Sequence, residues 1–180
     1  MEVERMKELE SRRRIYQYIF ENPGVHYREI ARNLNIPFGS LDYHLSYLSR
    51  HGMVTILKDG GYTRYYARKD VDARKKNILS VLRHELPRAI VLFLMKNGGA
   101  RHKEITGAFN VSGATISYHL KRMLEKGILL VEGSGREHFY SVRDPEMVAD
   151  VLITYRRSFG DRLVDAFVRS WILEKKEEGD

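Results

Sequence analysis

The tripeptide Tyr-His-Leu occurs twice in this chain, beginning at Tyr43 and again at Tyr118. A histidine beside a tyrosine can move a proton, bind a metal ion or make hydrogen bonds. The repetition therefore fits a duplicated catalytic or metal site, a duplicated binding surface, or one small fold used twice. The residues around the two copies decide among these alternatives.

Catalysis and metal binding find little support in the residue pattern. The chain has seven histidines and no cysteine, which excludes a thiolate metal site. His44 and His51 share a helix face, but seven residues span about 10.5 Å along a helix. Bonds of about 2 Å to one ion cannot bridge that distance. We expect no enzyme activity, no metal and no cofactor, and a histidine and carboxylate site between subunits stays an open alternative.

The composition indicates a folded protein, and its basic charge fits either a polyanionic partner or solubility alone. Hydrophobic residues make up 43% of the 180 residues, and the net charge of +7 with a pI of about 9.6 suits the phosphates of nucleic acid. The absence of cysteine fits a reducing compartment, the first ten residues lack a signal peptide pattern, and the longest apolar run is too short for a bilayer. These features predict a cytoplasmic protein.

The Tyr-His-Leu copies belong to a longer internal repeat. They are 118 − 43 = 75 positions apart, and the same offset aligns identical residues through much of each copy. The aligned pairs include Ile15 with Ile90, Asn22 with Asn97, Gly24 with Gly99, and Gly52 with Gly127. After the glycine-bearing turns the offset becomes 74, so that Tyr66 matches Tyr140. A period kept over about 55 residues indicates that one structural unit is duplicated.

Each copy has the same predicted order of elements. Residues 12–24 and 87–99 read as a helix that ends at a glycine, and residues 26–34 and 101–109 read as a shorter helix. A third helix carries Tyr-His-Leu, and residues 54–67 and 129–142 read as hairpins. Three helices followed by a hairpin form the winged helix-turn-helix plan. The predicted fold is therefore mainly α with small β-hairpins (α+β).

The repeat also sets the predicted domain organisation. Residues 1–70 form a first winged helix domain, 71–86 a linker helix, 87–143 a second winged helix domain, and 144–180 a C-terminal helical hairpin broken near Ser158–Gly160. Leu163, Phe167 and Trp171 belong to an apolar stripe on the last helix. This stripe either packs back on the chain's own linker helix or pairs with its copy in a homodimer.

The segments 36–54 (IPFGSLDYHLSYLSRHGMV) and 111–129 (VSGATISYHLKRMLEKGIL) resemble the helix-turn-helix signature of ArsR- and MarR-like bacterial and archaeal regulators. Both copies fit, over most of residues 11–143. The tandem arrangement is most similar to archaeal transcriptional regulators built from two winged helices. The resemblance implies a transcriptional regulator, without enzymatic activity, that binds double-stranded DNA in a sequence-specific manner.

The third helix of each copy carries most of the residues predicted to contact DNA. Leu41, Leu45 and Leu48 fall on one face of the first copy's helix, so that Tyr43 and Tyr47 point outward. A hairpin arginine in each copy is placed to reach phosphates. The predicted contact residues are Ser40, Tyr43, Ser46, Tyr47, Arg50, Arg64, Thr115, Ser117, Tyr118, Lys121, Arg122 and Arg136.

A function from another class fits the same fold. Winged helices also serve as protein-interaction or assembly modules in transcription and chromosome machinery, and fold alone does not fix function. Asp42 and the aromatic residues near the third helix of the first copy suit such a role. The sequence leaves open the operator, an effector ligand, the direction of regulation and whether both winged helices bind DNA.

Overall fold

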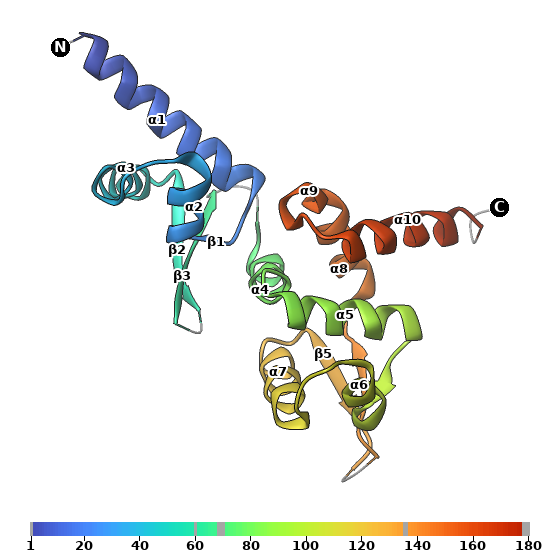
Figure 1. Cartoon of the computed structure of the whole chain (residues 1–180). Helices are drawn as coiled ribbons and strands as arrows, with labels where there is room; N and C mark the ends of the chain where they lie inside the picture. Colours follow the sequence, from blue (N-terminus) through green and yellow to red (C-terminus); the bar gives the residue numbers. More distant parts are fainter. Residues whose placement is uncertain (1, 60, 68–70, 135–136, 178–180) are drawn as a thin grey trace. The chain divides into compact units, whose positions relative to one another are not determined.

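The computed structural model describes residues 2–59, 61–67, 71–134 and 137–177 (Figure 1). The chain divides into two compact units, Met1–Lys76 and Asn77–Asp180. Helices dominate both units, and each contains one small antiparallel sheet. The predicted fold class, mainly α with small β elements, is confirmed.

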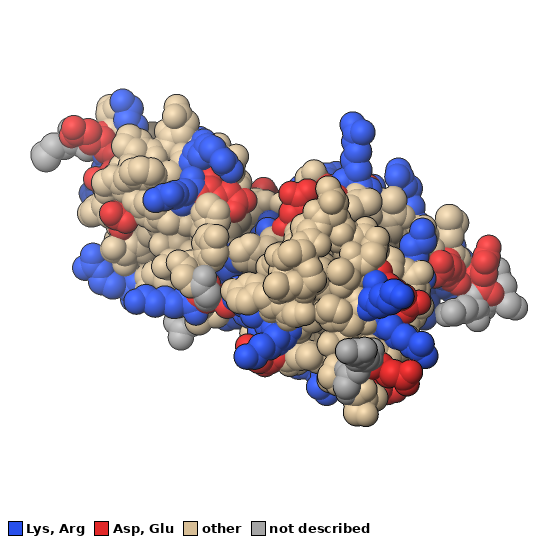
Figure 2. All heavy atoms as spheres, turned by 60° about the horizontal axis from the view of Figure 1, so that its bottom comes forward, with Lys and Arg blue, Asp and Glu red and all other residues tan. Residues whose placement is uncertain are grey.

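Charged side chains are dispersed over the face of the molecule shown in Figure 2. On the face shown in Figure 2, Lys and Arg side chains occur on both units, interspersed with Asp and Glu and separated by uncharged areas. Within each unit, the described Lys and Arg side chains on this face do not form one continuous basic strip. Among the described residues, no helix is both long enough and apolar enough to cross a membrane.

The first unit follows the order helix, strand, two helices, hairpin. Its elements are α1 (Glu2–Glu21), β1 (Val25–His26), α2 (Tyr27–Leu34), α3 (Phe38–Arg50), β2 (Val54–Asp59) and β3 (Tyr62–Ala67). The strands pair in the antiparallel order β1-β3-β2. Apolar residues of α1, α2 and α3, among them Ile15, Ile30 and Leu41, are fully buried in its core. Burial of these side chains is the main force that holds the helices together.

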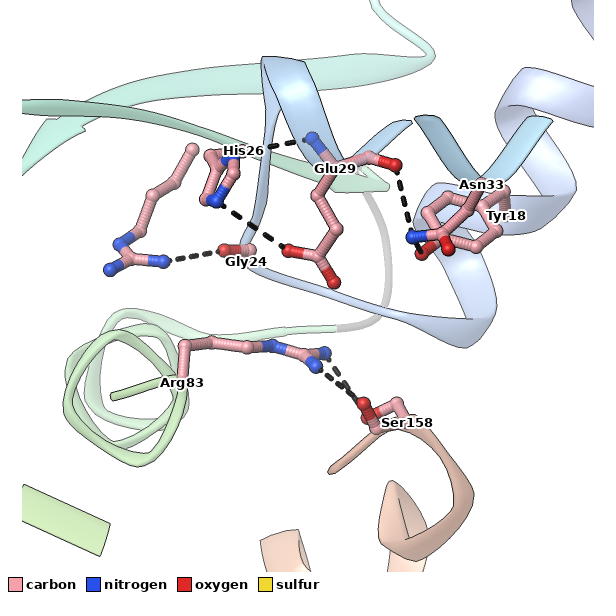
Figure 3. A network of polar contacts seen from close by, with 8 residues as sticks. Tyr18, Gly24, His26, Glu29, Asn33, Arg83 and Ser158 are labelled. Atoms are coloured by element: carbon pink, nitrogen blue, oxygen red, sulfur yellow. Dashed lines mark hydrogen bonds and ion pairs between the residues drawn. The ribbon is translucent and has the colours of Figure 1, made fainter. Parts of the chain in front are cut away.

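Polar contacts fix the start of α2 in the first unit (Figure 3). The imidazole Nδ1 of His26 accepts a hydrogen bond from the backbone N–H of Glu29 at 3.3 Å, which caps the helix. Asn33 donates from its side chain to the Tyr18 hydroxyl at 2.8 Å and to the Glu29 carbonyl at 3.0 Å. These contacts connect α2 to α1 and so position the helix that precedes α3.

The second unit begins within α4 (Ala73–Leu82) and repeats this order. Its elements are α5 (Glu85–Asn97), β4 (Ala100–Arg101), α6 (His102–Ala108), α7 (Gly113–Glu125), β5 (Leu129–Glu132) and β6 (Phe139–Val142). The sheet order β4-β6-β5 is the counterpart of that in the first unit. In α4, residues 78–82 are all buried.

One feature differs from the sequence-based expectation. The sequence predicts two-stranded hairpins, whereas the two-residue strands β1 and β4 add a third strand to each sheet. Two residues are too few to produce a detectable alternation of apolar and polar residues. The division between the two compact units falls inside α4, at Lys76–Asn77, and α4 itself lies within the segment 71–86 that the sequence predicts as a linker helix.

The C-terminal segment folds against the second unit. It forms α8 (Pro145–Thr154), the single turn α9 (Arg156–Phe159) and α10 (Arg162–Glu177), with Gly160 in a left-handed conformation between the last two. Arg88 on α5 forms an ion pair with Asp161 at 2.7 Å, and Arg83 donates to the carbonyl and hydroxyl of Ser158 at 3.0 and 3.1 Å (Figure 3). Burial alone would raise the pKa of Asp161, but the hydrogen bond and charge of Arg88 lower it.

Gly99 allows a close approach of α5 to the sheet, and this predicts a large effect of Gly99→Ala. At φ +116°, its added Cβ would lie 2.5 Å from the Phe139 ring and 2.8 Å from the Tyr140 carbonyl oxygen. We expect a loss of unfolding free energy of roughly 2–5 kcal/mol, from backbone strain and overpacking together. Denaturant unfolding followed by the fluorescence of Trp171, the chain's single tryptophan, measures it.

The neighbouring Gly98 provides the matched control. It also has a positive φ, +66°, but no atom lies within 4 Å of its added Cβ. Gly98→Ala should therefore lose only about 1–2 kcal/mol, the cost of the left-handed conformation. Equal losses for the two variants would contradict a role for close packing at Gly99.

Candidate nucleic-acid interface

Helix α7 of the second unit is held by one apolar face and an N-terminal cap. Ile116, Leu120 and Met123 are buried, which turns the opposite face of the helix outward. Ser112 caps the helix, because its hydroxyl accepts a hydrogen bond from the backbone N–H of Thr115 at 3.1 Å. The N-terminal end of α7 is therefore fixed.

The outward face of α7 carries the predicted contact residues of the second unit. Ser117, Tyr118 and Lys121 are exposed, and Thr115 and Arg122 are half-buried. Arg122 donates from Nη1 to the Tyr118 hydroxyl at 3.4 Å. Lys121 lies 3.9 Å from the Glu125 carboxylate, but both side chains are largely exposed, so this pair is weak and leaves Lys121 available to a stronger anion.

Helix α3 presents a different surface in the first unit. Its N-cap is Pro37, which makes no side-chain cap hydrogen bond, and Phe38 in its first turn is 59% exposed. Ser40, Ser46 and Arg50 are exposed, Tyr43 is half exposed and Tyr47 is half-buried. The predicted contact residues thus lie on the outward face in both units, but α3 offers mainly aromatic and hydroxyl groups.

The link between the second and third helices also differs between the units. In the second unit, His102 Nε2 and Ser117 Oγ share a hydrogen bond of 2.8 Å. The repeat offset of 75 replaces this pair by Tyr27 and Asp42 in the first unit. Burial, followed by the Asp42 carboxylate, raises the pKa of Tyr27 to about 12. The first unit therefore carries a negative charge where the second has a neutral serine.

Arg12, which is not among the contact residues predicted from the sequence, lies against the outward face of α3. Arg12 of α1 donates from Nη2 to the Tyr43 hydroxyl at 3.2 Å and to Glu8 at 3.2 Å. Its guanidinium carbon lies 3.9 Å from the centre of the Tyr47 ring, which in turn stacks on His51 at 3.9 Å. A run of three arginines at 12–14 fits either contact with phosphates or a solvated helix face, so the sequence alone does not show that Arg12 stacks on Tyr47.

The expectation that Arg64 reaches phosphates is corrected by its position. Only 2% of its side chain is exposed, because Arg64 lies two residues inside β3, opposite His26 of β1. Its Nη1 donates to the Gly24 carbonyl at 2.8 Å, and its Nε lies 3.4 Å from the Asp59 carboxylate. The guanidinium thus ties the hairpin to the end of α1. Arg136, the corresponding prediction in the second unit, lies outside the described residues.

The two histidines of the Tyr-His-Leu copies are packing residues in the structure. His44 is 3% exposed and His119 is half-buried, and each ring makes an edge contact with the preceding tyrosine at 5.2 Å. Burial lowers the pKa of both histidines. The positive charge of Arg12 lowers the pKa of His44 further, and that of Arg122 does the same for His119. Among the described residues, no three His, Asp or Glu side chains gather as metal ligands would.

Comparisons with known families support this arrangement. A family described as an N-terminal HTH domain matches residues 9–79, and a family described as winged helix-turn-helix DNA-binding matches residues 83–129. The chain therefore carries two tandem helix-turn-helix domains, as its repeat predicts, and the second matches a family model described as winged helix-turn-helix DNA-binding.

One curated relative is an uncharacterized HTH-type transcriptional regulator of Methanocaldococcus jannaschii, 33% identical over 135 residues. The alignment covers 75% of this chain, which spans only 34% of that relative. A crystal structure of an ArsR family transcriptional regulator aligns with TM-score 0.37 and 16% identity, over 60% of this chain and 92% of that one. A structure of the ESCRT-II endosomal trafficking complex aligns with a TM-score of 0.28 and 16% sequence identity. That alignment covers 73% of this chain and 59% of the other chain. TM-scores this low do not establish a relationship, so the similarity to known proteins rests on the two family matches and the archaeal relative.

The lowered pKa of His44 predicts that the first unit becomes less stable in mild acid. Below pH 6.5, the usual pKa of histidine, the unfolded chain binds a proton that the folded unit resists, so the free energy of unfolding falls as the pH falls toward the folded pKa. The change in the free energy of unfolding due to this histidine should be at most about 1.4 kcal/mol per pH unit. Unfolding followed by NMR signals of the first unit between pH 7.5 and 5 measures it.

Two substitutions on α3 test the assignment to His44. His44→Gln should flatten the pH dependence of the first unit, although it also removes packing and lowers stability at all pH values. Ser46→Ala, at an exposed position on α3 without an ionisable group, should leave the pH dependence unchanged. A parent protein whose first unit is equally stable at pH 7.5 and 5 would contradict the prediction.

Proposed function

We propose that the chain is a transcription regulator that binds a specific sequence of double-stranded DNA and catalyses no reaction. The observation that carries the proposal is the capped helix α7, which presents Lys121, Arg122 and Tyr118 on its outward face within a DNA-binding helix-turn-helix unit. In helix-turn-helix complexes this face enters the major groove, where Arg and Lys pair with guanine edges. With such a partner, we place the protein in the cytoplasm.

The proposal assigns different tasks to the two units. Helix α7 carries two cations on its outward face, whereas α3 carries Tyr43, Tyr47 and the exposed carboxylate of Asp42. A carboxylate repels phosphates and lowers the local affinity for DNA. We therefore propose that the second unit supplies most base contacts and that Ser40, Tyr43, Ser46, Tyr47 and Arg50 of the first unit contribute weaker contacts.

A protein-interaction module is the second candidate, favoured by the exposed Phe38 beside Asp42 at the start of α3. Selection of bound sequences from a random duplex library separates the two candidates. Enrichment of one sequence supports the regulator, and an asymmetric site indicates that the units read different half-sites. Absence of enrichment overturns sequence-specific binding and favours the interaction module.

Removing the two cations of α7 tests the assigned face. Lys121→Ala with Arg122→Ala should weaken binding to the selected duplex by about 10- to 100-fold, because contacts to bases or phosphates are lost. If both residues lie at phosphates, the slope of log affinity against log salt should become less steep by about 1.8. Fluorescence anisotropy over a salt series measures both quantities.

The matched control removes the same charge far from α7. Arg169 and Lys176 are exposed on α10, and their double replacement by alanine should change affinity little. Parent-like binding by the Lys121 and Arg122 variant would show that the assigned face is wrong.

We also propose that α10 pairs with its copy in a homodimer. One side of α10 packs against its own unit and buries Val164 and Val168. The side chains of Leu163 and Leu173 remain 59% and 61% exposed. Phe167 and Trp171 are half-buried and line a groove of about 410 Å³ between α10 and α5. Exposed leucines beside aromatic residues are suited to a two-fold contact.

Sedimentation at low micromolar concentration measures the association. The parent should sediment as a dimer and Leu163→Asp as a monomer, because a charge in an apolar contact is costly. Ile153→Asp, at an exposed apolar position on α8, serves as the control and should remain dimeric. A monomer mass for the parent would end the proposal.

A further inference from the structure

Each unit places a guanidinium against the same tyrosine hydroxyl, although the arginine comes from a different helix. Tyr43 and Tyr118 are equivalent at the repeat offset of 75. The Tyr43 hydroxyl accepts from Arg12 on α1 at 3.2 Å, and the Tyr118 hydroxyl accepts from Arg122 on α7 at 3.4 Å. The same offset aligns Arg12 with Pro87, so the contact is common to both units while the arginine is not.

The residue at the position of Arg122 in the first unit is Tyr47, and it supports the substitute arginine. The guanidinium of Arg12 lies 3.9 Å from the Tyr47 ring centre and 5.5 Å from that of Tyr43. In the second unit the Arg122 guanidinium lies 5.8 Å from the ring of Tyr118. A guanidinium stacked on an aromatic ring is held in place by the charge–quadrupole attraction. Arg12 thus takes over the place of the arginine that α3 lacks at position 47.

The histidine that follows each tyrosine lies close to the same guanidinium. His44 and His119 follow the two tyrosines, and each ring packs edge-on against its tyrosine at 5.2 Å. After burial, the positive charge of Arg12 lowers the pKa of His44, and that of Arg122 lowers the pKa of His119. A tyrosine, a histidine and a guanidinium therefore form one recurring cluster at both third helices, with the tyrosine exposed and the histidine packed behind it.

The hydrogen bond from arginine determines what the tyrosine can offer to a ligand. A phenol has one proton to donate, and its oxygen accepts through lone pairs. When the oxygen accepts from a guanidinium, the proton remains to be donated outward, and Tyr43 and Tyr118 are 50% and 56% exposed. The best-matched ligand group is negatively charged and only accepts hydrogen bonds. On duplex DNA this group is the phosphate oxygen.

We propose that Tyr43 and Tyr118 each donate a hydrogen bond to a DNA backbone phosphate, and that Arg12 and Arg122 are positioning residues that orient the hydroxyl and place a positive charge beside it. The inference rests on the proposed DNA binding and adds Arg12 to the interface. It also gives the first unit a role that needs no base contact: the unit fixes the register of the chain on the duplex.

The tyrosines are tested first, because Tyr→Phe removes the hydroxyl and keeps the ring. Tyr43→Phe and Tyr118→Phe should each weaken binding to the selected duplex by roughly 10- to 150-fold, the range for a hydrogen bond to a charged group. The slope of log affinity against log salt should stay unchanged, since no cation is removed. Parent-like affinity in both variants overturns the inference.

Arg12 is tested by separating its charge from its geometry. Arg12→Ala should weaken binding and reduce the salt slope by about 0.9, whereas Arg12→Lys should weaken binding and retain the slope, because lysine keeps the charge without the stacked, fork-shaped donor. The double variant Arg12→Ala with Tyr43→Phe should lose less than the sum of the single losses, since Arg12 acts partly through Tyr43. Additive losses overturn the positioning role.

Arg13 provides the matched control, as the next residue on α1 with an exposed side chain. Arg13→Ala should leave both the affinity and the salt slope close to those of the parent. An effect as large as that of Arg12→Ala would mean that general charge explains the result, and it would overturn the specific role of Arg12.

An NMR titration tests the cluster without DNA. Arg12→Ala should raise the pKa of His44 toward its usual value, because the repelling charge is gone, and Arg13→Ala should leave it unchanged. An unchanged His44 pKa in the Arg12 variant overturns the cluster. If the parent shows no salt-dependent binding to duplex DNA, the proposed function fails; if the parent binds and the tyrosine variants bind equally well, the inference alone fails.

Discussion

Burial of one apolar face on the third helix of each unit is the constraint on which the rest of the surface depends. Leu41, Leu45 and Leu48 in α3, and Ile116, Leu120 and Met123 in α7, are removed from water. At 100° per residue, this burial leaves no freedom in which side chains point outward. A tyrosine next to a boundary histidine therefore faces solvent in both units. The repetition of Tyr-His-Leu reflects this geometry and requires no catalytic or metal-binding role.

The sequence predicts well what depends on periodicity and least well what depends on tertiary contact. The order of helices and hairpins followed from apolar spacing and glycine positions, and the tandem domains followed from the offset of 75. The short strands β1 and β4 escaped detection, because two residues cannot show alternation. The sequence predicts that Arg64 lies on the hairpin and reaches phosphates, but the pairing of its strand with His26 places its side chain in the interior. Burial of a charged side chain requires partners that only the folded chain brings together, here the Gly24 carbonyl and Asp59.

The two units have diverged in charge while keeping their architecture. The pair His102 and Ser117 in the second unit corresponds to Tyr27 and Asp42 in the first, so the same connection between two helices is neutral in one unit and acidic in the other. The capped start of α7 likewise contrasts with the uncapped start of α3 at Pro37. A helix whose first turn exposes Phe38 beside a carboxylate is poorly suited to approach phosphates with its N-terminal end.

The guanidinium beside each tyrosine shows that a duplicated unit can keep an interaction without keeping the residue that makes it. Position 122 supplies the arginine in the second unit, while the first unit has Tyr47 there and obtains the charge from Arg12, 35 residues earlier in the chain. An aligned comparison of the copies scores both positions as differences. Only the contacts reveal that the differences compensate each other, because the stacked Tyr47 ring holds the substitute guanidinium where Arg122 would have placed it. Divergence between the two copies is therefore better judged from the groups they present to a partner than from the residues they share.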